Sequence, residues 1–259
     1  MTTPTVLVHR DADLLAQAIA ARLVTRLVDV QTARGSASLV LTGGGIGIKT
    51  LAALAASPAR DAVDWRRLDI WWGDERFLPS GHPDRNETQA RQALLDEVDL
   101  DPARVHPMPA SDGPDGDNPE AAADRYAAEL ARAARPEDHG PVPAFDVLLL
   151  GMGPDAHVAS LFPEMPALYD TRPVVAVRGA PKPPPTRISL TLPAIQAAKE
   201  VWLIVAGAEK APAVRLALSG AGAVQVPAAG AVGRVRTLWL LDRAAAREIP
   251  SGLTRIASP

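Results

Sequence analysis

The chain contains no cysteine among its 259 residues. Disulfide bonds, cysteine-ligated zinc sites and a cysteine nucleophile are therefore excluded. The absence suits a reducing compartment, and we expect a cytoplasmic protein.

Long apolar segments and a strong charge of one sign are also absent. No run approaches the roughly 18 apolar residues of a membrane span, and residues 1–13 show no charged leader before an apolar stretch. The formal net charge of −3 gives no general attraction to nucleic acid or to a membrane. We therefore expect neither as a partner, and an anionic ligand would need a local cluster of basic side chains.

Short apolar segments alternate with helical patterns along the chain. Hydrophobic residues make up 47% and charged residues 22%, which is typical of a globular protein. The patterns predict strands at 5–8, 38–41, 68–72, 145–150, 174–177, 187–191, 201–206 and 237–241. They predict helices at 11–33 with Asp11 as cap, at 48–55, at 86–96 with Asn86 as cap, at 119–134, at 209–218 and, in short form, after Asp242.

This alternation predicts an α/β fold. We expect a mostly parallel, doubly wound (Rossmann-like) sheet with helices on both faces and a small additional strand region. No linker divides the chain clearly, so residues 1–259 are taken as one domain, with the Pro-, Gly- and Asp-rich loop at 107–119 as its weakest point. Ligands of such sheets bind at the carboxyl ends of the strands. The loops after Leu41, Trp72, Leu150 and Ala206 should therefore share one edge.

The first of these loops is rich in glycine, in the sequence LVLTGGGIGIKT at 39–50. A nucleotide P-loop needs a glycine where this chain has Ile48, and the dinucleotide pattern G-x-G-x-x-G is not completed from Gly43 or from Gly45. Gly43, Gly44 and Gly45 would let backbone N–H groups approach an anion at a helix start. The residues favour a small phosphate, while a tight turn with no ligand stays open.

The second loop follows a pair of tryptophans in WWGDERFLP at 71–79. Asp74, Glu75 and Arg76 come at the strand end, and buried charges of this kind need partners. Two interpretations stay open: a local ion-pair network that holds the turn, or an anionic ligand on Arg76.

The third loop, GMGPDAHVASLFP at 151–163, is rich in glycine, directly follows an apolar strand and contains His157. Histidine suits proton transfer near neutral pH, and Asp155 is close enough to orient the ring. Ser160 lacks the G-x-S-x-G elbow of a nucleophile and is interpreted as the start of a short helix. The zinc motif H-E-x-x-H is absent. His82, Asp84 and Glu87 lie in a polar loop, where solvation suits them better than metal binding.

Basic residues follow the later strands. Lys182 and Arg187 flank the proline run at 181–185, and Lys210 follows the strand at 201–206. Each could be a solvated surface charge, but their places at strand ends favour a converging basic rim, with Arg187 able to hold a phosphate through two hydrogen bonds and Lys210 acting as a point charge. The proline run is also typical of SH3-type ligands, although a rigid loop at an active site fits the context better.

Taken together, these segments resemble the 6-phosphogluconolactonase family, within a superfamily that also holds glucosamine-6-phosphate deaminases. The resemblance covers nearly the whole chain and is carried by LTGGG (41–45), WWGDERFLP (71–79), GMGPDAHVASLFP (151–163), KPPPTRISLTLPAI (182–195), VAGAEK (205–210) and WLLDRAAA (239–246). It implies hydrolysis of 6-phospho-D-glucono-1,5-lactone in the oxidative pentose phosphate pathway, without metal or other cofactor. The protein would be a monomer or weak dimer.

The resemblance also implies roles for single residues. His157 matches the catalytic histidine of the family, and we expect Asp155 and Asp74 to be catalytic residues as well. The implied phosphate-binding residues are Thr42, Gly43, Gly44, Gly45, Arg76, Arg187 and Lys210. This chain departs from the family at Gly45-Ile46, where Ser-Thr is frequent, and at Ala156, where glycine is usual.

Phe162 separates the lactonases from the deaminases. It occupies the place of the glutamate that assists ring opening in the deaminase loop, so the lactonase form is favoured. We expect His157 to take a proton from water as it attacks C1 and then to protonate the departing ring oxygen. The donor to the oxyanion stays open between an arginine and a loop N–H. A sugar-phosphate sensor is the non-enzymic alternative, but mere binding would not need the histidine.

Overall fold

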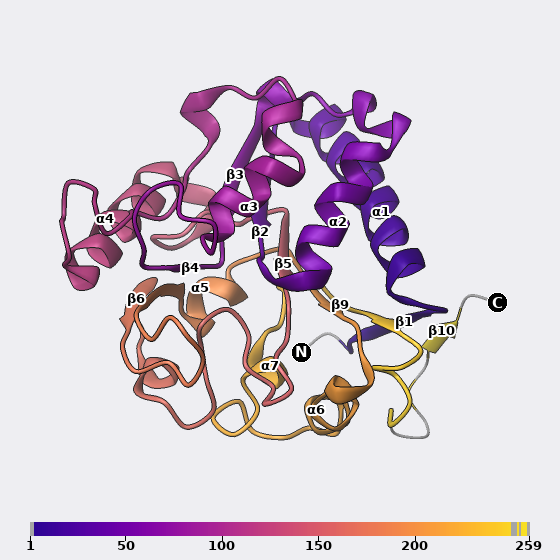
Figure 1. The fold of residues 1–259 in the computed structure, drawn as a ribbon. Helices are drawn as coiled ribbons and strands as arrows, with labels where there is room; N and C mark the ends of the chain where they lie inside the picture. The colour runs from indigo at the N-terminus through magenta and orange to yellow at the C-terminus, as the bar shows by residue number, and fades with distance from the viewer. Residues whose placement is uncertain (1–2, 250–252, 254, 258–259) are drawn as a thin grey trace.

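The computed structural model describes residues 3–249, 253 and 255–257. Its main sheet has seven strands within these residues, all paired in parallel. Their order is β10 (Arg255–Ala257), β1 (Thr5–His9), β9 (Arg236–Asp242), β8 (Glu200–Val205), β5 (Val147–Leu150), β2 (Ala37–Leu41) and β3 (Leu68–Trp72). The α/β class and the parallel sheet are confirmed (Figure 1).

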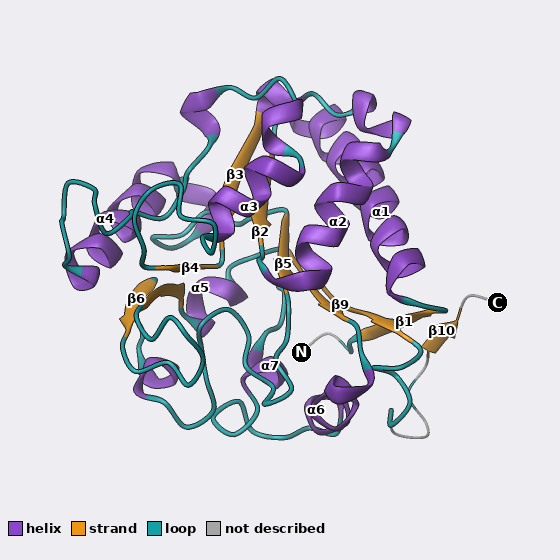
Figure 2. Cartoon of the chain, viewed as in Figure 1, coloured by secondary structure: helices purple, strands orange, loops and turns teal. Residues whose placement is uncertain are grey.

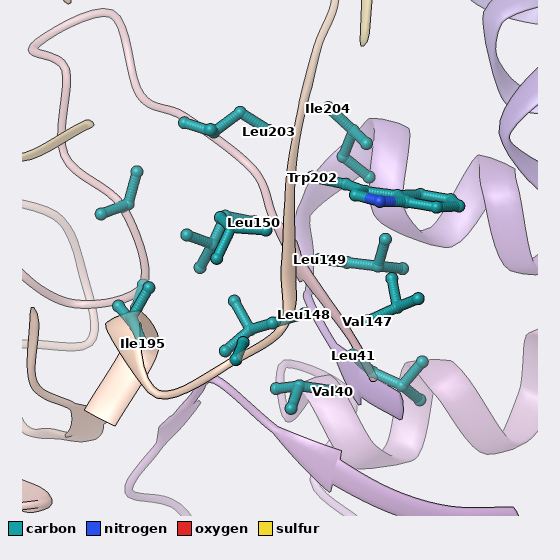
Figure 3. Close-up of a cluster of buried hydrophobic side chains, with 14 of the residues drawn as sticks. Val40, Leu41, Val147, Leu148, Leu149, Leu150, Ile195, Trp202, Leu203 and Ile204 are labelled. Carbon is teal, nitrogen blue, oxygen red and sulfur yellow. The ribbon is translucent and has the colours of Figure 1, made fainter. Parts of the chain in front are cut away.

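Both faces of the sheet are buried because its central strands are apolar throughout. Leu148, Leu150 and Leu203 point to one side of β5 and β8, whereas Leu149 and Trp202 point to the other (Figure 3). Alternate side chains of a strand point to opposite faces, so an unbroken apolar run needs cover on both.

Helices provide this cover. α1 (Ala12–Arg34) and α2 (Gly44–Ala56) pack side by side, and α5 (Leu192–Gln196), α6 (Ala211–Leu218) and α7 (Pro227–Gly230) lie across the sheet from them (Figure 2). The predicted cap of α1 is confirmed, since the Asp11 carboxylate accepts a hydrogen bond from Leu14 N at 2.8 Å. Helix α3 spans Asn86–Ala93 and α4 spans Pro119–Ala133.

A second, antiparallel sheet forms the predicted additional strand region. It consists of β4 (Asp74–Arg76), β7 (Arg187–Leu190) and β6 (Val174–Val177), with α4 packed against β6 and β7. Strand β4 is a correction, because residues 74–76 were expected as a loop. It pairs with β7, more than a hundred residues away, and nothing in three charged residues signals that partner.

Four local predictions are wrong. Helix α2 begins at Gly44, four residues before the expected start, because its glycine-rich first turn looks like a loop in the sequence. Arg85, not Asn86, is the N-cap of α3. Ser160 lies in a turn bridged by Val158 and Leu161 and starts no helix. Asp242 ends β9 and is followed by turns, although its carboxylate does accept a hydrogen bond from Ala245 N.

Candidate active site

A cavity of about 600 Å³ opens at the carboxyl ends of β2, β5 and β8. We call it the carboxyl-edge cavity. All the residues predicted to bind substrate line it: Thr42, Gly43, Gly44, Gly45, Arg76, Arg187 and Lys210. His157 and Asp74 line it as well, while Asp155 lies behind His157. The loops expected to share one edge therefore do so.

The glycine loop turns directly into α2. Gly43 is the N-cap, no side chain caps this end, and the first turn holds no acidic residue. The first N–H groups of a helix lack partners within the helix, and its dipole is positive there. Gly44 has a φ of 82°, in the left-handed region that favours glycine. The open, positive end of α2 therefore faces the cavity.

The residues that suggested a nucleotide loop have other contacts. Ile48 packs against the core, and Lys49 forms an ion pair with Asp13 on α1. The Thr50 hydroxyl donates to Ile46 O at 2.8 Å. Lys49 reaches the cavity wall, but neither residue is arranged as in a P-loop.

His157 and Asp155 form a hydrogen-bonded pair. His157 Nδ1 lies 2.5 Å from Asp155 Oδ1. Because an ionised carboxylate can only accept, Nδ1 carries the proton and Nε2 is the free nitrogen of the neutral ring. Burial raises the pKa of Asp155, but the hydrogen bond from His157 and the charges of His157 and Lys182 outweigh it and lower the pKa to about 2. This arrangement would suit a general base with an orienting carboxylate.

Two neighbours fix the position of the histidine ring. A Cβ on Gly153 would lie 2.1 Å from His157 Nδ1, so only glycine fits beneath the ring. On another side the ring centroid of Phe162 lies 4.5 Å from that of His157. Phe162 is almost fully buried, and a glutamate in its place would need a partner for its charge.

Asp74 is buried, and side chains from two other segments hold its carboxylate. Ser160 Oγ donates to Oδ2 at 2.7 Å, and Asn86 Nδ2 lies 3.3 Å from Oδ1. Thr42 makes a comparable link, since its hydroxyl accepts from Gly151 N at 3.2 Å. These contacts join the glycine loop, β4 and the histidine loop.

Both interpretations of residues 74–76 have a counterpart in the structure. Glu75 is fully buried and accepts from the backbone N–H groups of Arg76, Asn86 and Glu87. Burial raises its pKa to about 7, against the opposing charge of Arg85 and these hydrogen bonds. Glu75 therefore holds the turn, whereas the neighbouring Arg76 faces the cavity.

Arg76 and Arg187 differ in the groups they leave free. Arg76 Nη1 donates to Asp84 O at 2.7 Å, and its buried Nε has no hydrogen-bond partner among the described residues. Arg187 donates through Nε to Pro184 O at 3.1 Å and through Nη2 to Lys182 O at 3.0 Å. The edge of Arg187 that would bind a phosphate through two bonds is thus occupied. Arg76 is the arginine with an uncommitted edge.

Burial disfavours the charged form of two cations that line the cavity, Lys210 and Arg187. Burial lowers the pKa of Lys210, and the charge of Lys182 lowers it further. Burial also lowers the pKa of Arg187, although Asp74 opposes this. An anion placed among these groups would relieve both effects.

Several of these site residues were not predicted from the sequence. Asn86 was expected as a cap and Ser160 as a helix start, yet both hold Asp74 across separations that no local pattern reveals. The glycine-rich composition of 151–153 was a signal for Gly153, but not for its contact with the ring. Within the described residues, no three His, Asp or Glu side chains are grouped as a metal site requires. No helix in this part of the chain is long and apolar enough to cross a membrane.

Comparison with known proteins defines the class. The family model described as glucosamine-6-phosphate isomerases/6-phosphogluconolactonase matches residues 10–239, and the chain belongs to this family. A 6-phosphogluconolactonase of Streptomyces coelicolor is 67% identical over 99% of this chain and 98% of its own length. One of Mycobacterium tuberculosis is 53% identical over 93% of this chain and 96% of its own.

Solved structures share the fold. That of a 6-phosphogluconolactonase from Trypanosoma brucei matches with a TM-score of 0.81 and 28% identity, covering 96% of this chain and 100% of the other. A monomeric glucosamine-6-phosphate deaminase matches with a TM-score of 0.74 and 22% identity, over 93% and 99% of the two chains. The deaminase likeness concerns the fold alone.

Proposed function

We propose that this protein hydrolyses 6-phospho-D-glucono-1,5-lactone to 6-phospho-D-gluconate, the second step of the oxidative pentose phosphate pathway. The relatives with high identity over the full chain carry the name of this activity. The observation that carries the proposal is the hydrogen-bonded pair of His157 and Asp155 at this cavity. The same cavity is lined by the uncapped N-terminus of α2 and by Arg76, whose buried Nε has no partner among the described residues.

His157 acts as the general base in this proposal. Water gives a proton to Nε2 while its oxygen bonds to C1, and the carbonyl electron pair moves onto the carbonyl oxygen. When the tetrahedral intermediate collapses, the bond from C1 to the ring oxygen breaks and the imidazolium returns the proton to that oxygen. Asp155 keeps Nδ1 protonated and stabilises the transient imidazolium.

The phosphate is held away from the reacting carbon. The N–H groups at residues 43–45 and the positive end of α2 face it, and Arg76 offers its Nε edge. Lys210 adds a charge, and Arg187 can contribute only what its contacts with the proline loop leave free. Anchoring the phosphate away from the reacting carbon orients the lactone toward His157, and this orientation accelerates the reaction more than added affinity alone would.

For Asp74 we infer a positioning role in the reaction. Both carboxylate oxygens have partners, Ser160 on the histidine loop and Asn86 on α3. A carboxylate held in this way is poorly placed to receive a proton from substrate, but it ties the histidine loop to β4. We expect the protein to act as a monomer or weak dimer in the cytoplasm, without a metal or other cofactor.

A lactone-decay assay tests the proposal. The decay of δ-gluconolactone with and without the 6-phosphate is followed and corrected for spontaneous hydrolysis, for the wild type and for Arg76→Met. We expect a wild-type preference of about 10- to 100-fold in kcat/KM for the phosphorylated lactone, the size of a charge-assisted hydrogen bond, and most of it lost in the variant. Equal wild-type rates on both lactones would refute the phosphate anchor. Release of ammonia from glucosamine 6-phosphate would instead favour a deaminase.

A further inference from the structure

Lys182 lies beside the catalytic pair but has no part in the mechanism above. Its Nζ is 3.9 Å from Asp155 Oδ1, the same oxygen that holds His157 Nδ1 at 2.5 Å. The side chain lines the carboxyl-edge cavity and is 43% exposed. One carboxylate oxygen therefore faces both an imidazole and an ammonium group.

The backbone that carries Lys182 is anchored from β7. Arg187, which is 4% exposed, donates to the carbonyl oxygens of Lys182 at 3.0 Å, Pro183 at 3.2 Å and Pro184 at 3.1 Å. Its guanidinium also lies 5.7 Å from the centre of the Phe162 ring, which packs against His157. Arg187 therefore holds the backbone of Lys182 and also approaches the ring that packs against the histidine.

Charged groups from several elements line the cavity that holds His157, including Lys49 on α2 and Arg76 on β4. Asp155 lies on its own loop, Lys182 on the proline loop, and Arg187 and Asp74 on β7 and β4. Glu209 and Lys210 follow β8. Among the cations of the described residues that line the cavity, Lys182 forms an ion pair with the Asp155 carboxylate, at 3.9 Å. Its charge is also the second cause, after burial, of the lowered pKa of Lys210.

We propose that Lys182 is a positioning residue of the catalytic pair, which competes with the protonated His157 for Asp155 and so keeps the ring a free base at lower pH. The inference rests on the proposed function for its role in turnover. An ammonium near the imidazolium disfavours that charge. The same repulsion assists return of the proton to the ring oxygen when the lactone bond breaks.

The test compares Lys182→Met, Lys182→Arg and the wild type by two measurements. NMR titration of the His157 ring without substrate should show its midpoint about half a pH unit higher in Lys182→Met, the order of magnitude expected for one nearby charge in a solvated site. The pH at which kcat/KM for the phosphorylated lactone falls to half on the acid side should rise equally. Lys182→Arg should restore both values.

Arg178→Gln is the matched control. Arg178 is an exposed cation that precedes the same proline loop, but it pairs with Glu120 and does not line the cavity. It should leave both values unchanged. The substrate phosphate titrates in the same range but is common to all variants. An unmoved NMR midpoint in Lys182→Met, with only KM raised, would overturn the inference and make Lys182 a phosphate ligand. A wild type without lactonase activity would refute the proposed function, and the NMR result would still decide the role of Lys182.

Discussion

The two ends of the main sheet carry cavities of nearly equal size but opposite character. The carboxyl-edge cavity measures about 600 Å³, and a second one at the amino ends of β2, β3, β5 and β8 measures about 560 Å³. We call the second the amino-edge cavity. Arg34, Asp146 and Lys199 are among the residues that line it.

The charges of the amino-edge cavity satisfy one another. Buried Asp146 forms ion pairs with Arg34 and with Lys199, the latter at 3.1 Å, and accepts from Ser38 N at 2.9 Å. At the carboxyl edge, by contrast, Arg76 Nε is buried without a partner among the described residues, and the pKa of Lys210 is lowered. The two cavities are similar in volume, but in the described residues the carboxyl-edge cavity is the one lined by a buried arginine nitrogen without a hydrogen-bond partner. We therefore expect an anionic ligand at that edge.

The largest expected effect is at the carboxyl edge. His157→Asn should lower kcat by about 10²- to 10⁴-fold, because the water then has no base. Binding of the product 6-phosphogluconate should stay unchanged. His139→Asn is the matched control, since His139 is exposed and has a φ of 58° that asparagine tolerates. Turnover near the wild-type rate in His157→Asn would make the base assignment wrong.

The buried Glu75, which lies between the cavity residues Asp74 and Arg76, should make stability depend on pH. Its pKa is raised from 4.5 to about 7 by burial, so the native state keeps a proton that the unfolded chain releases near pH 4.5. The free energy of unfolding should therefore fall as pH rises from about 4.5 to 7, by up to about 3 kcal/mol. In Glu75→Gln this slope should disappear. Urea unfolding at several pH values measures it, and equal slopes in both proteins would contradict the expectation.

Asp146→Ala should sharpen the contrast at the amino edge. It leaves Arg34 and Lys199 without their shared carboxylate, but both are partly exposed. We expect a loss of about 2 kcal/mol in the free energy of unfolding, less than for a fully buried pair. The kcat/KM of the folded protein should stay at the wild-type value. A variant that folds normally but loses activity would show that this edge takes part in function.

Ala156→Gly should have the smallest effect. Ala156 has a φ of 66°, in the left-handed region, which costs about 1 kcal/mol for a residue with a Cβ. Glycine removes that strain but loses a buried methyl group of about 0.8 kcal/mol. Stability measured by urea unfolding should change by less than about 1 kcal/mol. A loss above about 2 kcal/mol would mean that the methyl group supports the histidine loop.

Much of the fold follows from local patterns. The apolar runs at β5 and β8 can be buried on both faces only in a covered parallel sheet, and the end of each strand then places its loop at one edge. The short strand β4 was missed because its pairing with β7 is long-range. The start of α2 was missed because its glycines are helical only through their place in the fold.

The candidate site shows the same division. His157 and Asp155 are two residues apart, and their pairing was predicted from that spacing. Ser160 and Asp74 are 86 positions apart, and no periodicity links them. The carbonyl contacts of Arg187 depend on the path of the proline loop, so the sequence indicated its charge but not which of its edges was free.

Calorimetric binding of 6-phosphogluconate tests most directly whether the carboxyl edge is the functional one. Arg76→Met removes the arginine whose Nε edge has no partner among the described residues, and Arg104→Met removes an arginine that is paired with Asp69 at the amino-edge cavity. The wild type should bind the product at one site, Arg76→Met should bind it at least about 10-fold more weakly, and Arg104→Met should bind it normally. Normal binding by Arg76→Met together with loss in Arg104→Met would contradict the assignment.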